Sequence, residues 1–330
     1  MDTSLSGSKA AGGRGSSRAP LLSRIPPEVI LVGFLAALIA LFSLRSPFFL
    51  AVGNFRNILL SVAVLGILAI PSTMLLVSAN VDLSVASNAA LCGMLLAFVG
   101  NEYGVVAGVL AALVAGTLMG ALNGFLVASV GINAIITTLG TLSVFRGMAK
   151  LVSNGQTIRL SGFEFSYLGS EATLGVPNSV ILLALTAIAF YLLMRYTVFG
   201  RSIYAIGSNA QAARLSGIGL RKNLFAVFVM TGFLSAVAGL ILTSQLRAAA
   251  PVAGLGLELS VVAAVLLGGA SLNGGRGTVV GTMLGVLILG TLSNGLTILS
   301  VSSFWQEIAN GAVLIIAVGL DQLRLRFQQT

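Results

Sequence analysis

The sequence predicts an all-α protein, a polytopic membrane helical bundle of about ten transmembrane helices. Hydrophobic residues make up 57% of the 330 positions and charged residues only 8%, whereas about a quarter of the residues of a soluble domain are charged. The mean hydropathy is +1.03. The apolar residues also occur in successive runs of about 20, the length that a helix needs to cross the apolar core of a bilayer. A water-soluble globular fold is therefore excluded.

The predicted elements follow one another with mostly short connections. Residues 1–24 are rich in Gly, Ser and basic side chains, so we expect a disordered cytoplasmic tail. Residues 25–330 are expected to form one transmembrane domain. The predicted spans are residues 29–44, 57–78, 82–99, 105–129, 133–151, 178–197, 224–246, 257–272, 278–299 and 304–321.

Lys and Arg side chains indicate how the spans are oriented, because they accumulate in cytoplasmic connections. The connection after the sixth span carries Arg201, Arg214, Arg221 and Lys222. With the tail inside, most cations fall in cytoplasmic segments, and both termini are predicted to be cytoplasmic. The net charge of +9 comes from cations scattered between apolar runs. Nucleic acid is therefore not expected as a partner.

An internal repeat relates the two halves of the chain. VDLSV at 81–85 matches LELSV at 257–261, and GVVAGVLAALVAGTLMGALNG from Gly104 resembles GTVVGTMLGVLILGTLSNG from Gly277. Spans two to five thus correspond to spans seven to ten. Because an odd number of spans separates the copies, they cross the membrane in opposite senses, an inverted repeat that is typical of alternating-access transporters. Chance similarity between Gly-rich membrane helices is the alternative.

Two connections are long enough to form structure of their own. The external one, residues 153–177, suits contact with an extracytoplasmic partner or coverage of a pore mouth, and a loop folded onto its own helices fits equally well. The internal one, residues 199–223, contains SNAQAARLSGIG. Its Ala-rich middle favours a short helix that Gly217 and Gly219 would end. Such a helix between two spans is a good docking element.

Polar residues within the spans are few. Asp82 and Glu258 each lie at the start of a span, where the helix dipole stabilises a carboxylate; capping is the expected role, and ion coupling is the alternative. The middles of the spans are nearly free of charge, which favours an uncharged solute and an outside energy source. Amides and hydroxyls can bind a polyol or join helices. The candidate pathway residues are Asn88, Asn123, Asn133, Thr137, Thr138, Ser143 and Asn294.

The composition argues against an enzyme. The chain has no histidine and one cysteine, Cys92, so a Ser/His/Asp arrangement, an internal disulfide and the usual metal clusters are all ruled out. GGASLNGGRG at 268–277 is rich in glycine but lacks the Lys-Ser/Thr ending of a phosphate-binding loop. We expect no catalytic residue and no bound cofactor.

Several segments together resemble the permease subunits of bacterial ABC importers for monosaccharides, the ribose, xylose and arabinose group. The resemblance covers nearly everything after the tail. It rests on VDLSVAS (81–87), LNGFLVASVGINAIITTLGTLSVFRGMAKLVSNGQTI (122–158), FGRSIYAIGSNAQAARLSGI (199–218) and LELSVVAAVLLGGASLNGGRGTVVGT (257–282). It implies a permease domain over residues 25–330 in the bacterial inner membrane, a separate ATPase subunit, a periplasmic sugar-binding protein and a second permease copy or paralogue.

The resemblance also implies that the internal connection supplies a coupling helix to the ATPase. The residues at the matching positions are Asn209, Gln211, Ala212, Ala213, Arg214, Leu215, Ser216 and Gly217. Gln211 stands where the importer class usually has Glu, which puts a salt bridge from that position in doubt. Residues 78–87 read SANVDLSVAS where such permeases commonly have GGIDLSVGS. An ion-coupled secondary transporter, or a same-fold permease for another solute such as a branched-chain amino acid, are the alternatives.

Overall fold

The structure, a computed structural model, describes residues 27–329 except 162, 163 and 170. The predicted tail, residues 1–24, lies outside the described residues. Within the described part, helices account for almost all regular structure, and seven of them are long and apolar enough to cross a membrane. The predicted class, a polytopic helical membrane bundle, is therefore confirmed.

The helices alternate with short connections, and the few strands are two residues long. The helices are α1 (Pro27–Arg45), α2 (Val52–Val77), α3 (Val85–Tyr103), α4 (Val105–Gly124), the π-helical segment η2 (Phe125–Val130), α5 (Ala134–Leu151), α6 (Asn178–Tyr196), α7 (Val198–Ser208), α8 (Ala210–Leu215), α9 (Leu220–Leu246), α10 (Leu257–Leu267), α11 (Val279–Ile298) and α12 (Ser303–Gln329). The strands are β1 (Ile158–Arg159), β2 (Ala172–Thr173), β3 (Val176–Pro177) and β4 (Ala248–Ala249).

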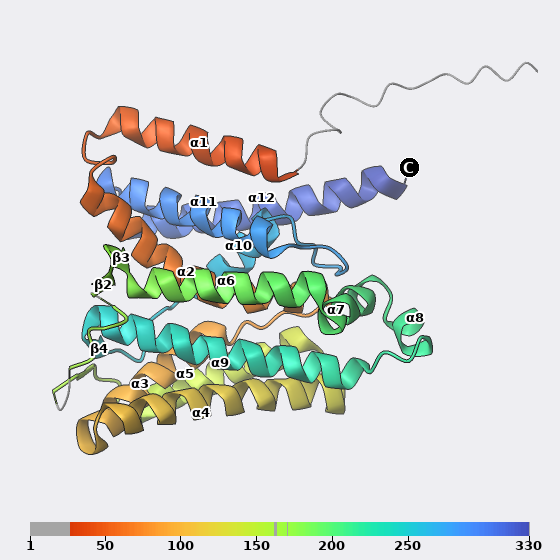
Figure 1. The fold of residues 1–330 in the computed structure, drawn as a ribbon, viewed down its shortest axis with the longest axis horizontal. Coiled ribbons are helices and arrows are strands. Elements are labelled where there is room, and N and C mark those ends of the chain that lie inside the picture. Colours follow the sequence, from red (N-terminus) through yellow and green to blue (C-terminus); the bar gives the residue numbers. More distant parts are fainter. Residues whose placement is uncertain (1–26, 162–163, 170, 330) are drawn as a thin grey trace, which may run out of the picture.

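The long helices run side by side, and the short elements gather at the two ends of the bundle (Figure 1). One end carries α7 and α8, together with the start of α1 and the end of α12. The opposite end carries the strands, where β1 pairs antiparallel with β4 and β2 with β3. The long connection 153–177 therefore contributes to both small sheets at the end away from α8.

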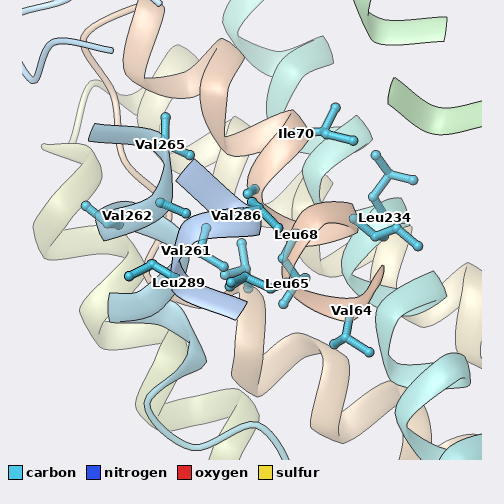
Figure 2. Packing of buried hydrophobic residues seen from close by; sticks show 14 of the residues in the cluster. Val64, Leu65, Leu68, Ile70, Leu234, Val261, Val262, Val265, Val286 and Leu289 are labelled. Carbon is cyan, nitrogen blue, oxygen red and sulfur yellow. The ribbon is translucent and has the colours of Figure 1, made fainter. Parts of the chain in front are cut away.

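Helix α2 forms the centre of the bundle. Every residue from Val62 to Val77 is buried, as expected for a helix that is apolar on all sides. It packs against α6, α9, α10 and α11. Figure 2 shows side chains of α2, such as Leu65 and Leu68, next to Val261 of α10 and Val286 of α11. The core thus joins the first half of the chain to the second.

Glycines let α4 and α9 approach closely. A Cβ atom on Gly120 would lie 2.4 Å from the carbonyl oxygen of Phe228, and one on Gly232 would lie 2.4 Å from that of Gly116. Such contacts are impossible for any larger residue unless a backbone moves. Because lipid provides no hydrophobic force between helices, this close packing is what holds membrane helices together.

The helix contacts occur in corresponding sets. Helix α3 packs on α4, α5 and α9, and α10 packs on α11, α12 and α2. Helix α4 packs on α9, and α11 packs on α2. If α2 to α5 correspond to α9 to α12, each contact in one set has its counterpart in the other. This is the pattern that the predicted repeat requires.

Two predicted spans have other bounds in the structure. The span expected at 257–272 is helical only from Leu257 to Leu267, about 16 Å at 1.5 Å per residue. Gly269, with φ +90°, turns the chain out of the helix soon after. The span expected from residue 82 becomes helical only at Val85. The prediction of ten spans therefore stays a prediction.

Candidate functional site

The short helix α8 is the feature that extends furthest from the end of the bundle that carries it (Figure 1). Asn209 caps it, since its Oδ1 accepts a hydrogen bond of 2.9 Å from the backbone N–H of Ala212. The helix ends where Gly217 takes φ +81° and the N–H of Ile218 donates to the carbonyl of Ala213. This is a Schellman ending, which favours glycine at that position. The short helix expected here is confirmed.

Most of the α8 surface is free. Ala213 is buried, whereas Gln211, Ala212, Arg214 and Ser216 are exposed. Leu215 is 83% exposed, so its apolar side chain is accessible to another molecule. The sequence-predicted docking residues thus lie together on one accessible element.

Helix α7 joins α8 to the rest of the bundle. A Cβ atom on Gly207 would come within 1.7 Å of the carbonyl oxygen of Val77 at the end of α2, so only glycine fits there. The Tyr204 hydroxyl donates a hydrogen bond of 2.6 Å to the carbonyl of Gly277, and the N–H of Gly275 donates to Val77. Burial raises the pKa of the Tyr204 hydroxyl. Helix α7, α2 and the glycine-rich connection before α11 are therefore held together.

A closed polar cluster precedes α3. Asp82 is buried, and its Oδ1 accepts hydrogen bonds of 2.8 Å from the Ser84 N–H and 2.6 Å from the Ser84 hydroxyl. Asn123 of α4 donates to the Ser84 hydroxyl at 2.8 Å and to Asp82 Oδ2 at 3.4 Å. We call Asp82, Ser84 and Asn123 the Asp82 network. We expected Asp82 to cap the first turn of α3. Its carboxylate instead holds the turn that leads into this helix.

A more open arrangement lies at the start of α10. Oε1 of Glu258 accepts a hydrogen bond of 3.3 Å from the N–H of Gly256, and its buried Oε2 has no partner among the described residues. This bond comes from the residue that precedes the helix, as it does for Asp82 and Ser84, so the capping role expected for Glu258 stays a prediction. Arg146 of α5 is attracted to this carboxylate. Its Nη1 donates to the carbonyls of Pro251 and Ala253 at 3.0 and 2.9 Å, while its buried Nε and Nη2 find no partner in the described part of the chain.

Sequence reasoning missed Arg146 as a site residue. An arginine near the end of a predicted span is normally a side chain that reaches the membrane surface. The structure instead buries it, at 7% exposure. A charge inside a span usually marks a functional site, and that signal was present in the sequence.

The start of α10 also borders a hollow of 380 Å³ between α10 and α12. Its polar lining residues are Ser260 on α10 and Gln306, Glu307 and Asn310 on α12. Hydroxyl, amide and carboxylate groups in one hollow can hydrogen-bond to a polar solute.

The other pathway candidates are scattered. Asn88 donates to the Gly116 carbonyl at 3.3 Å and therefore joins α3 to α4. Asn133 caps α5 through the N–H of Ile135. Asn294 lies on α11, and its buried Oδ1 has no partner within the described residues. Of the three, Asn294 is the one with a free buried polar atom.

The hydroxyl candidates all lie on α5. Thr138 donates to the Ala134 carbonyl at 2.8 Å and reaches the Val81 carbonyl at 3.5 Å, beside the Asp82 network. Ser143 is exposed and bonds to Leu139 of its own helix. The buried Thr137 hydroxyl has no partner among the residues described. Of the candidate pathway residues that the structure describes, only Asn123 and Thr138 thus lie beside a predicted acid, Asp82.

One family of transport proteins matches most of the chain. The family model described as branched-chain amino acid transport system / permease component matches residues 54–318. The chain belongs to this family. The ribose import permease protein RbsC of Bacillus subtilis is 42% identical over 288 residues, which cover 86% of this chain and 89% of that protein.

Other relatives are almost as similar. The ribose import permease protein RbsC of Escherichia coli is 40% identical over 292 residues, 87% of this chain and 91% of that protein. The L-arabinose transport system permease protein AraH of Escherichia coli is 39% identical over 285 residues, 86% of this chain and 87% of that protein. The resemblance inferred from the sequence motifs is therefore confirmed. The chain is a multi-pass membrane permease.

Proposed function

We propose that this permease moves a monosaccharide, a pentose or hexose, into a bacterial cell across the inner membrane. The observation that carries the proposal is the identity of 39 to 42% with ribose and arabinose permeases across most of the chain. The family description names one component of a transport system. This favours a subunit driven by a separate ATPase over an ion-coupled carrier that works alone.

The ATPase would dock on α8. Its exposed residues, among them Leu215 and Gln211, form a short element that fits a groove of a partner. An apolar residue at the tip would be buried on docking, which is where binding energy concentrates. Gln211 would contribute a neutral hydrogen bond in place of a salt bridge.

Movement of α8 would reach the pathway through α7. Tyr204 and Gly207 hold α7 against the end of α2 and the connection before α11. A shift of the docked helix would therefore move both predicted halves of the repeat. This supports alternating access by rocking of the two halves.

The solute would pass near the starts of α3 and α10. In transporters with inverted repeats, solutes bind close to such interrupted helices. The hollow beside Ser260 and Asn310 offers groups suited to hydroxyls. A periplasmic sugar-binding protein would deliver the solute at the end that carries the strands, and a second copy or paralogue would complete the pathway. Both termini would then be cytoplasmic, as the start of α1 and the end of α12 share one end with α8.

A branched-chain amino acid is the second candidate solute. The buried guanidinium of Arg146 and the free carboxylate oxygen of Glu258 match the two charges of a zwitterion. The family description also names such amino acids. The identity with the sugar permeases favours the monosaccharide.

The solute is tested by ATP hydrolysis in proteoliposomes that hold this permease, its ATPase and its binding protein. We expect stimulation by one pentose or hexose and none by leucine, isoleucine or valine. Stimulation by an amino acid alone would refute the sugar assignment. Uptake by the permease alone under a proton or sodium gradient would refute ATP-driven import.

Docking is tested with Leu215→Glu, which places a charge on α8 at an 83% exposed position and so leaves the fold intact. We expect the ATPase to stop co-purifying with the permease, because the charge would be buried unpaired on docking. The matched control is Leu174→Glu, a fully exposed position in the turn between β2 and β3 at the opposite end, which should co-purify normally. Retained binding by the Leu215 variant would show that α8 is not the docking site.

A further inference from the structure

A hollow with a cationic lining lies between α6, α7 and the start of α11, at the end of the bundle that carries α8. Its volume is 340 Å³. Its described lining residues are Tyr191, Met194, Arg195, Arg201, Tyr204, Thr278 and Val279. Two of these side chains are cationic, and none of the described lining residues is acidic.

Arg195 is held in place by aromatic rings. Its guanidinium carbon lies 5.7 Å from the ring centre of Tyr191 and 5.8 Å from that of Tyr196, and its Nη1 donates to the Tyr191 hydroxyl at 2.9 Å. Cation–π contacts of this kind fix the side chain without neutralising its charge. The guanidinium is therefore oriented before any ligand arrives.

Arg201 provides a second charge. It lies on α7, is exposed, and lines the same hollow. Within the part of the chain that the structure describes, no carboxylate pairs with its guanidinium. Two guanidinium groups from different helices can therefore act on one anion, and arginine is the side chain best suited to phosphate.

The start of α11 adds to the positive potential. Thr278 caps this 20-residue helix by accepting a hydrogen bond of 2.9 Å from the N–H of Gly281. The positive end of the helix dipole is thus directed at the hollow, where Thr278 and Val279 form part of the lining. The dipole strengthens a site that the two arginines already define.

The position of the hollow indicates what carries the anion. Helices α6 and α11 are both apolar enough to cross a membrane, and the hollow lies where α6 ends and α11 begins. Tyr and Arg are typical of the membrane surface, and cationic pockets between helices there bind lipid headgroups. The apolar side chains of Met194 and Val279 would contact the lipid beyond its phosphate.

We propose that this hollow binds the phosphate group of an anionic phospholipid, with Arg195 and Arg201 as its two cationic contacts. The site is separate from α8 and from the starts of α3 and α10. The proposal does not depend on which solute the permease carries or on whether an ATPase drives it.

Native mass spectrometry of the purified full-length chain, titrated with phosphatidylglycerol in detergent, tests the proposal. We expect Arg195→Gln with Arg201→Gln to weaken binding of the first lipid roughly thirtyfold, from the contribution of two arginines near a membrane surface. Arg201→Gln alone changes an exposed residue and should weaken binding about fivefold. The single variant keeps the test decisive if the double variant folds poorly.

The matched control is Arg221→Gln with Lys222→Gln, which removes two exposed cations at the start of α9. It should change lipid affinity less than about threefold, because neither side chain lines the hollow. Equal weakening in the control and in the arginine variants would show non-specific attraction and overturn the site. Unchanged affinity in the arginine variants would overturn it as well.

Two further ligands identify the source of the phosphate. Phosphatidylcholine, which has no net charge, should bind more weakly than phosphatidylglycerol. Its affinity should be the same for the arginine variants and for the wild type. Inorganic phosphate should not displace phosphatidylglycerol at equal concentration. Displacement by inorganic phosphate would overturn the lipid assignment and indicate a soluble anion.

Discussion

The two acids that open α3 and α10 occupy matching places in the predicted repeat, yet their surroundings differ. Both oxygens of Asp82 accept hydrogen bonds, from Ser84 and Asn123. Glu258 has one bonded oxygen and one buried oxygen without a partner among the described residues. The same sequence pattern, an acid followed by Leu-Ser-Val, thus gives a closed cluster in one half and an open one in the other.

The asparagine on the following helix accounts for much of the difference. Asn123 donates to both members of the acid–Ser pair. Asn294, which ends the matching segment in the second half, makes no hydrogen bond to Glu258 or Ser260 within the described residues, and Oδ1 of both asparagines is buried without a partner there. The acid of the first half is therefore fixed by Ser84 and Asn123, whereas Glu258 retains a buried oxygen that can bind a solute or change partners as the halves move.

The largest expected effect concerns stability. Asp82→Ala should lower the free energy of unfolding by about 3 kcal/mol, because it leaves the buried donors of Ser84 and Asn123 unpaired. Glu258→Ala should cost about 1 kcal/mol, since it frees a single backbone N–H. Denaturation by dodecyl sulfate in micelles measures both. Equal losses of unfolding free energy in the two variants would contradict the difference between the two halves.

Double-mutant cycles compare the coupling energies of the two clusters. The cycle of Asp82→Asn with Asn123→Ala should give a coupling energy of about 1 kcal/mol, because the two side chains are bonded. The cycle of Arg146→Gln with Glu258→Gln should give about 0.5 kcal/mol or less, because attraction acts without a direct bond. A larger coupling in the second pair would mean that the second half is closed after all.

The smallest effect separates transport from stability. Asn294→Ala should leave unfolding within about 0.5 kcal/mol of wild type and reduce solute-stimulated ATP hydrolysis about fivefold, the loss of one hydrogen bond to the solute. Asn123→Ala is the matched variant in the first half, and we expect its main effect to be a lower free energy of unfolding. If Asn294→Ala hydrolyses ATP normally at every solute concentration, the open cluster has no part in transport.

Local features were predictable from the sequence, and features that depend on distant residues were not. The helix at Asn209 to Gly217 follows from a cap, an Ala-rich turn and a terminal glycine, all within a few residues. The partner of Asp82 is Asn123, 41 positions further along the chain, so capping was the reasonable expectation. No residue pattern indicates that carbonyls of the 251–253 turn bind Arg146.

The same distinction explains the span boundaries. Apolar runs identify the long helices, because length and hydropathy are local properties. Helix α10 ends at Leu267 in a Schellman turn, because Gly269 takes φ +90° and the N–H of Ala270 donates to the carbonyl of Val265. The two glycines after Leu267 are a local signal that the predicted span 257–272 passed over. The close approach of α11 to Gly268, in contrast, depends on a distant segment.

Solute uptake into proteoliposomes tests the central claim most directly. The vesicles would contain the permease, its ATPase with ATP on the α8 side, and the binding protein with labelled ribose or arabinose on the other side. We predict uptake that requires ATP, is lost with Leu215→Glu and persists without an ion gradient. Uptake that ignores ATP, or that survives the Leu215 substitution unchanged, would contradict it.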